Sequence, residues 1–379
     1  MAASLPEIPR HDFLLDPDVA FLNHGSFGAC PRPVFDSYQA RQRDLEWEPV
    51  DFLDRRLPTL LAPARAELAR YLNAPHDDLA FVTNATTGVN LAARSLELRP
   101  GDEILTTDLE YGACDLAWEW LAARTGSTYV RAPIPLPLTS PAELVEALFA
   151  PVTRRTRVVY VSHITSSTAL ILPVAEIVAR ARELGLVTIV DGAHAPAHVP
   201  VDLEALGADF YSGNAHKWLM APKGAAFLHV RPEHQERVDA AIVSWGYAAG
   251  RGFQERIELQ GTRDPAAWLA VPDAIRYQAE RDWDAVRARC QALTREARAE
   301  LCEIFGAEAL APEEMLGQMA SVRLPRPNPG LRDRLFTNHR VEIPVTGPNN
   351  DLLRVSVAAY TTRDEVDRLL AALVRELDA

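Results

Sequence analysis

The stretch ADFYSGNAHKWLMAPKG, residues 208–224, decides the fold more than any other part of the sequence. An apolar run that ends at Ser212 is followed by a polar turn with Asn214, His216 and Lys217, and then by a Gly/Pro loop. This order predicts a strand whose carboxyl end opens into a loop that can hold an anion and a reactive amine. A lysine in a loop is most often a solvated charge, so only its context can give Lys217 a function.

Short β-branched or apolar runs alternate with amphipathic stretches from about residue 79 to residue 230. The alternation predicts a parallel sheet covered by helices on both faces, which is an α/β fold. Helices are expected at 88–98 and 174–184. The expected strands end at Val82, Thr106, Ser162, Val190, Ser212 and Val230. Ligands bind such sheets where the carboxyl ends of the strands meet, so the site is expected on that edge.

The sequence changes character after residue 264. Long helical patterns are expected at roughly 266–305. Short strands are expected near 319–324 and 341–357, and a last amphipathic helix at 363–377. The proline-rich stretch 131–138 is expected to be a connecting loop. We therefore expect three parts: an N-terminal segment (1–25) that packs on the site and the small domain, a large domain (26–264) and a small α+β domain (265–379).

Composition excludes several classes of partner. The 379 residues include 39 Lys and Arg against 52 Asp and Glu, which gives a net charge of −13, so neither nucleic acid nor an anionic membrane is an expected partner. The N-terminus lacks the basic flank and apolar run of a signal peptide, and no run of about 18 apolar residues follows, which favours a cytoplasmic location. The four cysteines form no CxxC pair, so neither a metal site nor a disulfide is expected.

The segment VDGAHA, residues 190–195, places Asp191 directly after an apolar strand and ahead of Lys217 in the chain. A buried carboxylate needs a cationic partner. The protonated ring nitrogen of pyridoxal 5'-phosphate (PLP) is such a partner, and a carboxylate beside it keeps the ring an effective electron sink. The alternative is that Asp191 only caps the turn that follows.

The segment FVTNATTGVNLAAR, residues 81–94, predicts a strand and a Thr/Asn/Gly turn that opens a helix. Free N–H groups and the helix dipole favour a phosphate at such a start, although many similar turns are ordinary helix caps. The sequence contains neither GxGxxG nor a P-loop lysine, so dinucleotides and nucleoside triphosphates find no support.

In this order, the phosphate turn, the carboxylate and the lysine resemble the fold type I PLP enzymes, and within them the class V aminotransferase and cysteine desulfurase superfamily. The isopenicillin N epimerase-like branch is the most similar. Seven motifs carry the resemblance: FLNHGSFGACP (21–31), NATTGVN (84–90), LEYGA (109–113), SHITSSTALILPV (162–174), DGAHAP (191–196), HKW (216–218) and LRVSVAAYTT (353–362). The resemblance implies that PLP is held as an internal aldimine on Lys217.

The resemblance also implies which residues bind the cofactor. Ala85 and Thr86 would hold its phosphate, helped by Asn214 and His216. Tyr111 has the position of the residue that stacks on the pyridine ring, and its phenol could also move a proton.

Three further positions face the ring in the family. Asp191 would pair with the ring nitrogen and His194 would contact the ring oxygen, while Ser166 stands where desulfurases have an asparagine. The expected catalytic residues are Lys217, Asp191 and Tyr111.

Other positions concern the substrate and a second subunit. Arg354 would bind the α-carboxylate of an amino acid with its two-pronged guanidinium, and Asn23 and His24 would lie on the substrate side. Thr262, in LQGTRD, matches a Gly-Thr that reaches the phosphate of the partner subunit, which implies a homodimer with shared active sites.

The reaction stays open at this stage. Desulfurases need a nucleophilic cysteine shortly before the arginine, and the stretch FTNHRVEIPVTGPNNDLLR contains none. The resemblance favours an amino acid epimerase, in which Lys217 removes the Cα proton and Tyr111 returns one from the other face. The alternatives are a C–S lyase acting on a cysteine derivative, an aminotransferase, and a PLP-binding regulator without catalysis, which Arg354 argues against.

Overall fold

The computed structural model describes residues 8–347 and 349–377. The strands are β1 (Ala20–Phe21), β2 (Leu79–Val82), β3 (Glu103–Thr107), β4 (Thr128–Ala132), β5 (Thr156–Ser162), β6 (Val187–Gly192), β7 (Phe210–Asn214), β8 (Ala226–Val230), β9 (Met319–Arg323), β10 (Val341–Glu342), β11 (Val345–Thr346) and β12 (Leu352–Ser356). The helices are α1 (His24–Phe27), α2 (Arg32–Trp47), α3 (Leu57–Tyr71), α4 (Ala85–Arg94), α5 (Gly112–Thr125), α6 (Pro141–Phe149), α7 (Val174–Glu183), α8 (Leu203–Leu206), α9 (Pro232–Gln235), α10 (Phe253–Glu258), α11 (Ala266–Leu269), α12 (Val271–Ala279), α13 (Trp283–Phe305), α14 (Leu331–His339) and α15 (Arg363–Leu377).

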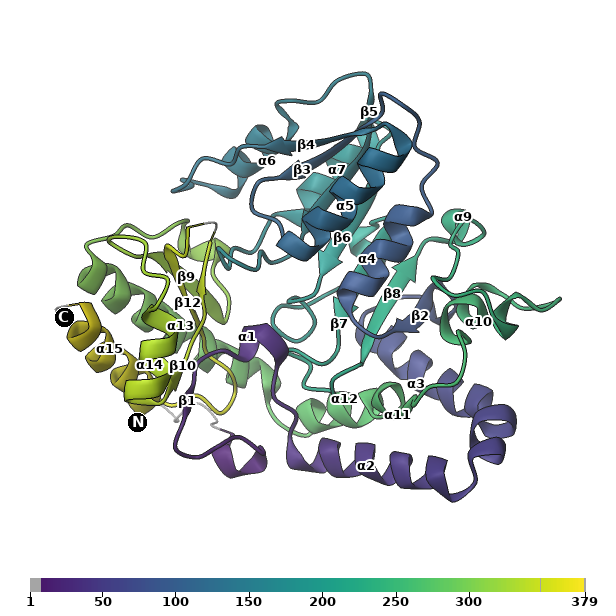
Figure 1. Ribbon diagram of the computed structural model, residues 1–379, viewed down its shortest axis with the longest axis horizontal. Helices are drawn as coiled ribbons and strands as arrows, with labels where there is room; N and C mark the ends of the chain where they lie inside the picture. The colour runs from purple at the N-terminus through teal and green to yellow at the C-terminus, as the bar shows by residue number, and fades with distance from the viewer. Residues whose placement is uncertain (1–7, 348, 378–379) are drawn as a thin grey trace.

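The main sheet has seven strands in the order β2-β8-β7-β6-β5-β3-β4, which confirms the α/β fold (Figure 1). The sheet is mainly parallel, as the sequence predicted, and β8 is the exception, since it runs antiparallel to both β7 and β2. The loop between β7 and β8 explains this, because a parallel connection needs a dozen or more residues and usually a helix. The loop is shorter than that and contains Lys217.

Side chains on successive strand residues enter two different cores. On β5, Val158 and Tyr160 pack in a cluster with α4 and α5, whereas Val159 and Val161 pack in the cluster that includes α6 and α7. This period of two means that both faces of the strand are buried. Helices therefore cover the sheet on both sides, as the sequence predicted.

Local signals explain where the boundaries differ from those expected. Helix α4 begins at Ala85, ahead of the expected position 88, because the Asn84 side chain accepts a hydrogen bond from the Thr87 N–H and caps it. The expected helical stretch 266–305 is divided into α11, α12 and α13. The proline-rich loop was expected to begin at 131, but β4 continues to Ala132 and pairs with β3.

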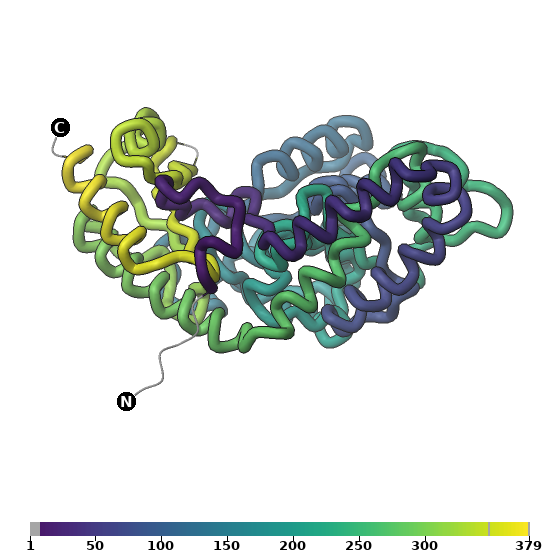
Figure 2. The backbone as a smooth tube through the Cα atoms, turned by 90° about the horizontal axis from the view of Figure 1, so that it is seen from below, coloured from purple at the N-terminus to yellow at the C-terminus, as the bar shows by residue number. Residues whose placement is uncertain are grey.

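A second sheet, β11-β12-β9, lies in the C-terminal part of the chain and packs against α13, which in turn contacts α15. Strand β1 pairs in parallel with β10, with Ala20 opposite Val341. Figure 2 shows the purple N-terminal chain passing from these C-terminal elements to α2 beside the large sheet. The division into three parts at residues 25 and 264 stays a prediction. Among the described residues, no helix is long and apolar enough to cross a membrane.

Candidate active site

A cavity of about 450 Å³ opens at the carboxyl edge of the large sheet. Its walls come from the ends of β5, β6 and β7, the first turn of α4, the turn that contains α1, and β12. Loops and helix starts converge on this edge, which is where the sequence predicted the site. The predicted residues that line the cavity are Thr86, Tyr111, Ser166, Asp191, His194, Asn214, His216, Lys217 and Arg354.

Lys217 lies in the loop after β7. Its Nζ is 3.1 Å from Nε2 of His194. Burial, and then the charge of Arg354, lower the pKa of Lys217 to about 7. The Lys217 carbonyl accepts a hydrogen bond from the Met220 N–H, in a turn where Met220 has a φ of +64°. The turn holds a partly neutral amine inside the protein at neutral pH.

Asp191 ends the apolar part of β6 and is buried. Its Oδ1 accepts a hydrogen bond from the Ala193 N–H at 2.9 Å, and its Oδ2 is 3.5 Å from both the Cys114 Sγ and the Tyr160 hydroxyl. Burial raises the pKa of Asp191 above its ordinary value. No salt bridge to Asp191 is present in the described part of the chain, so the carboxylate can accept a cation from a bound molecule.

Glu110 is a second buried acid, and the sequence analysis missed it. Its carboxylate accepts hydrogen bonds from the Thr107 hydroxyl and from both the N–H and the hydroxyl of Ser162, at 2.6–2.8 Å. Burial raises the pKa of Glu110 to about 8. Ser162 pairs with Asp191 across the sheet, so its hydrogen bonds hold Glu110, the residue before Tyr111, against the floor of the site.

The start of α4 forms the expected phosphate turn. The Ala85 N–H donates to Oδ1 of Asn214 at 2.8 Å, so this N–H is already used and Ala85 does not line the cavity. Thr86 does line it, and its N–H, in the first turn of the helix, has no acceptor within the helix by position. A Cβ at Gly88 would lie 2.0 Å from the Ser212 Oγ, so only glycine lets α4 approach β7 this closely.

His216 lies between the phosphate turn and the lysine. Its Nδ1 donates to the Ala225 carbonyl at 3.0 Å, which leaves Nε2 as the other polar atom of the ring. Burial lowers the pKa of His216 to about 4. Its Nε2 becomes a donor only when the ring takes up a proton, and an adjacent phosphate dianion would favour that.

Arg354, on β12, is fully enclosed. Nη1 donates to the carbonyl of Ser166 at 2.6 Å and to its Oγ at 3.3 Å, and Nη2 donates to the Ser26 Oγ at 3.1 Å. No described carboxylate forms a salt bridge with it, and its Nε is buried without a partner. Burial lowers the pKa of Arg354 to about 10. A buried guanidinium held only by neutral oxygens is suited to receive an anion.

Four predicted residues lie outside this cavity. Besides Ala85, these are Asn23 and His24, whose side chains bond to Glu342 and Tyr360 behind the cavity wall, and Thr262. Thr262 lines a separate cavity of about 540 Å³ together with Trp245. Ser166 was expected to contact the ring of PLP, but its carbonyl and hydroxyl oxygens accept hydrogen bonds from Arg354.

Other cavity residues were missed, and some had a usable signal. Ser162 ends a strand on the same edge as Asp191, so the rule that found Asp191 also applied to it. Ser26 lies in the Gly-rich motif beside Asn23 and His24. Its contact with Arg354 joins residues 328 positions apart, and no local pattern predicts such a pair.

A mainly parallel sheet with a buried lysine and a buried carboxylate at its carboxyl edge defines the class, a PLP-dependent enzyme of fold type I. The family model for Aminotransferase class-V matches residues 50–369. The chain belongs to this family, and PLP is the cofactor of the family.

Several proteins of known name are similar to this chain over most of its length. It is similar to "Isopenicillin N epimerase" from Streptomyces clavuligerus, at 41% identity over 98% of both chains. It is 34% identical to "Putative L-cysteine desulfhydrase 1" from rice, Oryza sativa subsp. japonica, over 81% of this chain and 67% of that one. A solved structure of a C-DES mutant with glycine linked to its PLP cofactor has a TM-score of 0.83 at 24% identity, covering 97% of this chain and 99% of that one, which shows the same fold.

The residues present fit PLP. The cofactor needs a lysine amine, an anion for its ring nitrogen and donors for its phosphate, and the cavity offers Lys217, the unpaired Asp191 and the start of α4. The Nδ1 of His194 is buried without a partner among the described residues, as is the Arg354 Nε. Such unpaired polar atoms are costly in a closed protein and are explained by a bound polar molecule.

Proposed function

We propose that this protein is an amino acid epimerase that acts at Cα with PLP on Lys217, and that its substrate resembles isopenicillin N. One observation carries the proposal: a single cavity is lined by the half-buried Lys217 and by the buried Asp191 and Arg354, and neither of the last two forms a salt bridge with another described residue. Sequence similarity supports the epimerase over the alternatives. The two isopenicillin N epimerases are 41% and 42% identical to this chain, whereas the rice desulfhydrase described above is 34% identical to it.

PLP, when bound, withdraws electrons from Cα and so makes the Cα proton acidic. Asp191 would hold the ring nitrogen protonated, and Tyr111 would stack on the ring. Thr86, Asn214 and His216 would hold the phosphate, and His194 would contact the ring oxygen.

Lys217 supplies the base on one face of the substrate. A pKa of about 7 means that about half of the amine is neutral at neutral pH and able to take a proton. His194 at 3.1 Å fixes the direction of the amine without adding a charge, because burial lowers the pKa of His194 well below its ordinary value.

Arg354 would bind the α-carboxylate with its two nitrogens, Nη1 and Nη2. Tyr111, which is 45% exposed at the mouth of the cavity, would return a proton to the face opposite Lys217. Epimerisation by two bases needs one such group on each side of Cα.

The second candidate is a C–S lyase that releases a sulfur substituent from Cβ after the same proton removal by Lys217. The desulfhydrase relatives favour it. An aminotransferase would use the same residues. A desulfurase that forms a persulfide is disfavoured, because Cys30 does not line the cavity and burial raises the pKa of its thiol to about 12.

We also propose a homodimer. Thr262 lines a cavity beside the large exposed Trp245, and Trp47 and Val243 are also exposed. Large apolar side chains in solvent indicate an interface, and Thr262 would then reach the phosphate site of the partner subunit. The cytoplasmic location expected from the sequence stays a prediction.

The proposal is tested by incubating the PLP-loaded protein in D₂O with L-cysteine, L-alanine and a peptide that has an L-α-aminoadipoyl group. Deuterium at Cα without pyruvate is expected for the epimerase, with inversion of the aminoadipoyl centre. Pyruvate together with released sulfide from L-cysteine would instead establish the lyase. A protein that shows no cofactor absorption after PLP is added would contradict both.

A further inference from the structure

The turn formed by residues 23–28, which includes α1, lies between the two cations of the cavity. It contacts Lys217 on one side and Arg354 on the other. The sequence analysis placed Asn23 and His24 on the substrate side, but the structure places their side chains behind the cavity wall. Their contacts indicate a different role.

His24 supports the peptide of Lys217. Its Nε2 is 3.1 Å from the Lys217 carbonyl oxygen and its Nδ1 is 2.9 Å from the Tyr360 hydroxyl. A carbonyl only accepts, so Nε2 must carry the proton, and Nδ1 then accepts from the Tyr360 hydroxyl. The ring is fully buried and rests against Trp218, with ring centroids 4.8 Å apart. Burial lowers the pKa of His24 to about 3, which keeps the ring neutral at neutral pH.

Ser26 supports the guanidinium of Arg354. Its Oγ accepts from Nη2 at 3.1 Å and donates to Oδ1 of Asn23 at 2.5 Å. The Asn23 side-chain amide in turn donates to Glu342 on β10 at 2.8 Å. This row of hydrogen bonds joins the guanidinium to the C-terminal part of the chain through the turn.

The turn also packs against both neighbours without free space. A Cβ at Gly28, where φ is +71°, would lie 2.2 Å from the His216 carbonyl oxygen and 2.8 Å from the Lys217 Cα. A Cβ at Gly25 would lie 2.4 Å from the Met319 sulfur on β9. The Lys223 ammonium donates to the Gly28 carbonyl at 2.9 Å, which closes the contact with the lysine loop.

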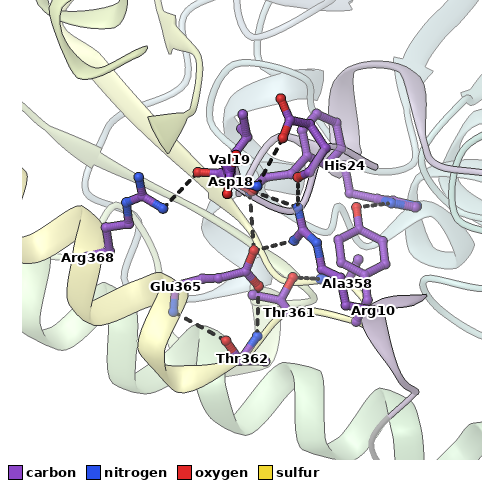
Figure 3. A network of polar contacts seen from close by, with 12 residues as sticks. Arg10, Asp18, Val19, His24, Ala358, Thr361, Thr362, Glu365 and Arg368 are labelled. Atoms are coloured by element: carbon purple, nitrogen blue, oxygen red, sulfur yellow. Dashed lines mark hydrogen bonds and ion pairs between the residues drawn. The ribbon is translucent and has the colours of Figure 1, made fainter. Parts of the chain in front are cut away.

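The chain before the turn is anchored on the C-terminal helix. Arg10 forms an ion pair with Glu365 on α15 and donates to the Val19 carbonyl at 2.6 Å, while Arg368 donates to the Asp18 carbonyl at 2.9 Å. Figure 3 shows this network, with His24 beside it. The turn is therefore held from the C-terminal side, both by this network and by the hydrogen bond between His24 and Tyr360.

We propose that the turn 23–28 is a positioning element that sets Lys217 relative to Arg354, with His24 holding the lysine peptide and Ser26 holding the guanidinium. The inference rests on the proposed function, in which one cation attaches PLP and the other binds the substrate carboxylate. Neither His24 nor Ser26 reacts, and both act through the residue they hold.

The test uses the pH at which Lys217 attaches PLP. Attachment is the condensation of the neutral amine with the cofactor aldehyde, in which a C=N bond forms and one water leaves, so its rate follows the neutral fraction of the amine. Other groups also act on this amine, from β6, its own loop, β12, α5 and the turn. They are Asp191, His194, His216, Arg354, Cys114 and His24.

Tyr360→Phe removes only the hydroxyl that orients His24. If the turn positions the lysine, water gains access to the loosened amine, its pKa rises, and the rate of PLP attachment to apoprotein at pH 7 falls about 3- to 10-fold, with the pH profile moved upward. His24→Leu should cause the same shift, whereas His24→Gln, which keeps a donor and an acceptor, should restore most of the wild-type profile. Tyr129→Phe is the matched control, because it removes one hydroxyl bond, to Asp115, at the far edge of the sheet.

Ser26→Ala tests the other contact. Two probes are titrated into the loaded protein and followed by the change in cofactor absorption: L-alanine, and ethylamine, which lacks the carboxylate. Loss of one hydrogen bond to Arg354 should weaken L-alanine about 5-fold and leave ethylamine unchanged, and the Tyr360→Phe variant should affect both probes alike.

Wild-type pH profiles in both Tyr360→Phe and His24→Leu would overturn the inference, as would equal weakening of the two probes in Ser26→Ala. Either result leaves the proposed function intact as long as the wild-type protein attaches PLP at Lys217. If the absorption of lysine-attached PLP persists when Lys217 is replaced, the proposed function itself fails, and the two failures are thus distinguishable.

Discussion

The wall of the cavity that carries Lys217 comes from neighbouring strands, whereas the wall that carries Arg354 is assembled from distant segments. Asp191, Asn214 and Lys217 follow β6 and β7, which are adjacent in both sequence and sheet. Arg354 meets Ser166 and Ser26, which are 188 and 328 residues away. The wall with Lys217, here called the cofactor wall, is thus encoded by neighbouring strands, and the wall with Arg354, the substrate wall, by long-range contacts. Substitutions in the two walls should therefore separate cofactor attachment from substrate affinity.

The largest effect is expected in the cofactor wall. Lys217→Ala removes both the attachment point and the base, so Cα exchange should fall by about 10³-fold or more and the absorption of bound PLP at neutral pH should change to that of the free aldehyde. Arg180→Ala, which removes a surface cation on α7 that pairs with Glu146, is the control and should retain the bound absorption. Normal exchange in Lys217→Ala would contradict the assignment.

Asp191→Asn keeps the shape of the side chain but removes its charge. The ring nitrogen would lose its counter-ion, and we expect Cα exchange to fall by about 10²-fold while PLP still attaches to Lys217. The measurement is the exchange rate at saturating cofactor, with the surface variant Asp202→Asn, at the start of α8, as a comparison. A variant with wild-type exchange would show that the carboxylate only caps a turn.

Arg354→Met should act on the binding of the substrate. Losing a two-pronged contact to a carboxylate is expected to raise KM for the amino acid about 30-fold in protein that is fully loaded with PLP, which still attaches to Lys217. Because the variant also removes a buried charge without a carboxylate partner, its melting temperature should equal or exceed that of the wild type. A lower KM, or loss of PLP, would contradict the conclusion that the substrate wall controls substrate affinity and the cofactor wall controls cofactor attachment.

The smallest effect concerns pH. Burial lowers the pKa of Lys217 to about 7, so the neutral base is present above pH 7 and is lost as the pH falls below it. Cα exchange should therefore fall about 10-fold for each pH unit below 7 and level off above it. The profile is measured from pH 5.5 to 8.5. A rate that stays constant down to pH 5.5 would rule out Lys217 as the base.

The same division explains what the sequence could predict. Strand ends, the Asp191 position and the lysine loop follow from local patterns of apolar and polar residues, and the structure has them at the expected edge. The sequence also predicted a mainly parallel sheet, whereas the direction of the one antiparallel strand, β8, depends on the length of the loop before it. The burial of Glu110 and the contact of Ser26 with Arg354 depend on how segments far apart in the chain pack together, and no periodicity in the sequence carries that information.

The pairing of β1 with β10 also has a consequence for synthesis. Ala20 leaves the ribosome early, but its partner Val341 lies near the other end of the chain. At roughly 5–20 residues per second, the N-terminal segment waits for roughly 15 to 60 s before its strand partner is made. The large sheet can fold in the meantime, because its seven strands lie between Leu79 and Val230. The substrate wall is thus the last part of the molecule to be completed, and a nascent chain holds the cofactor lysine before it can select a substrate.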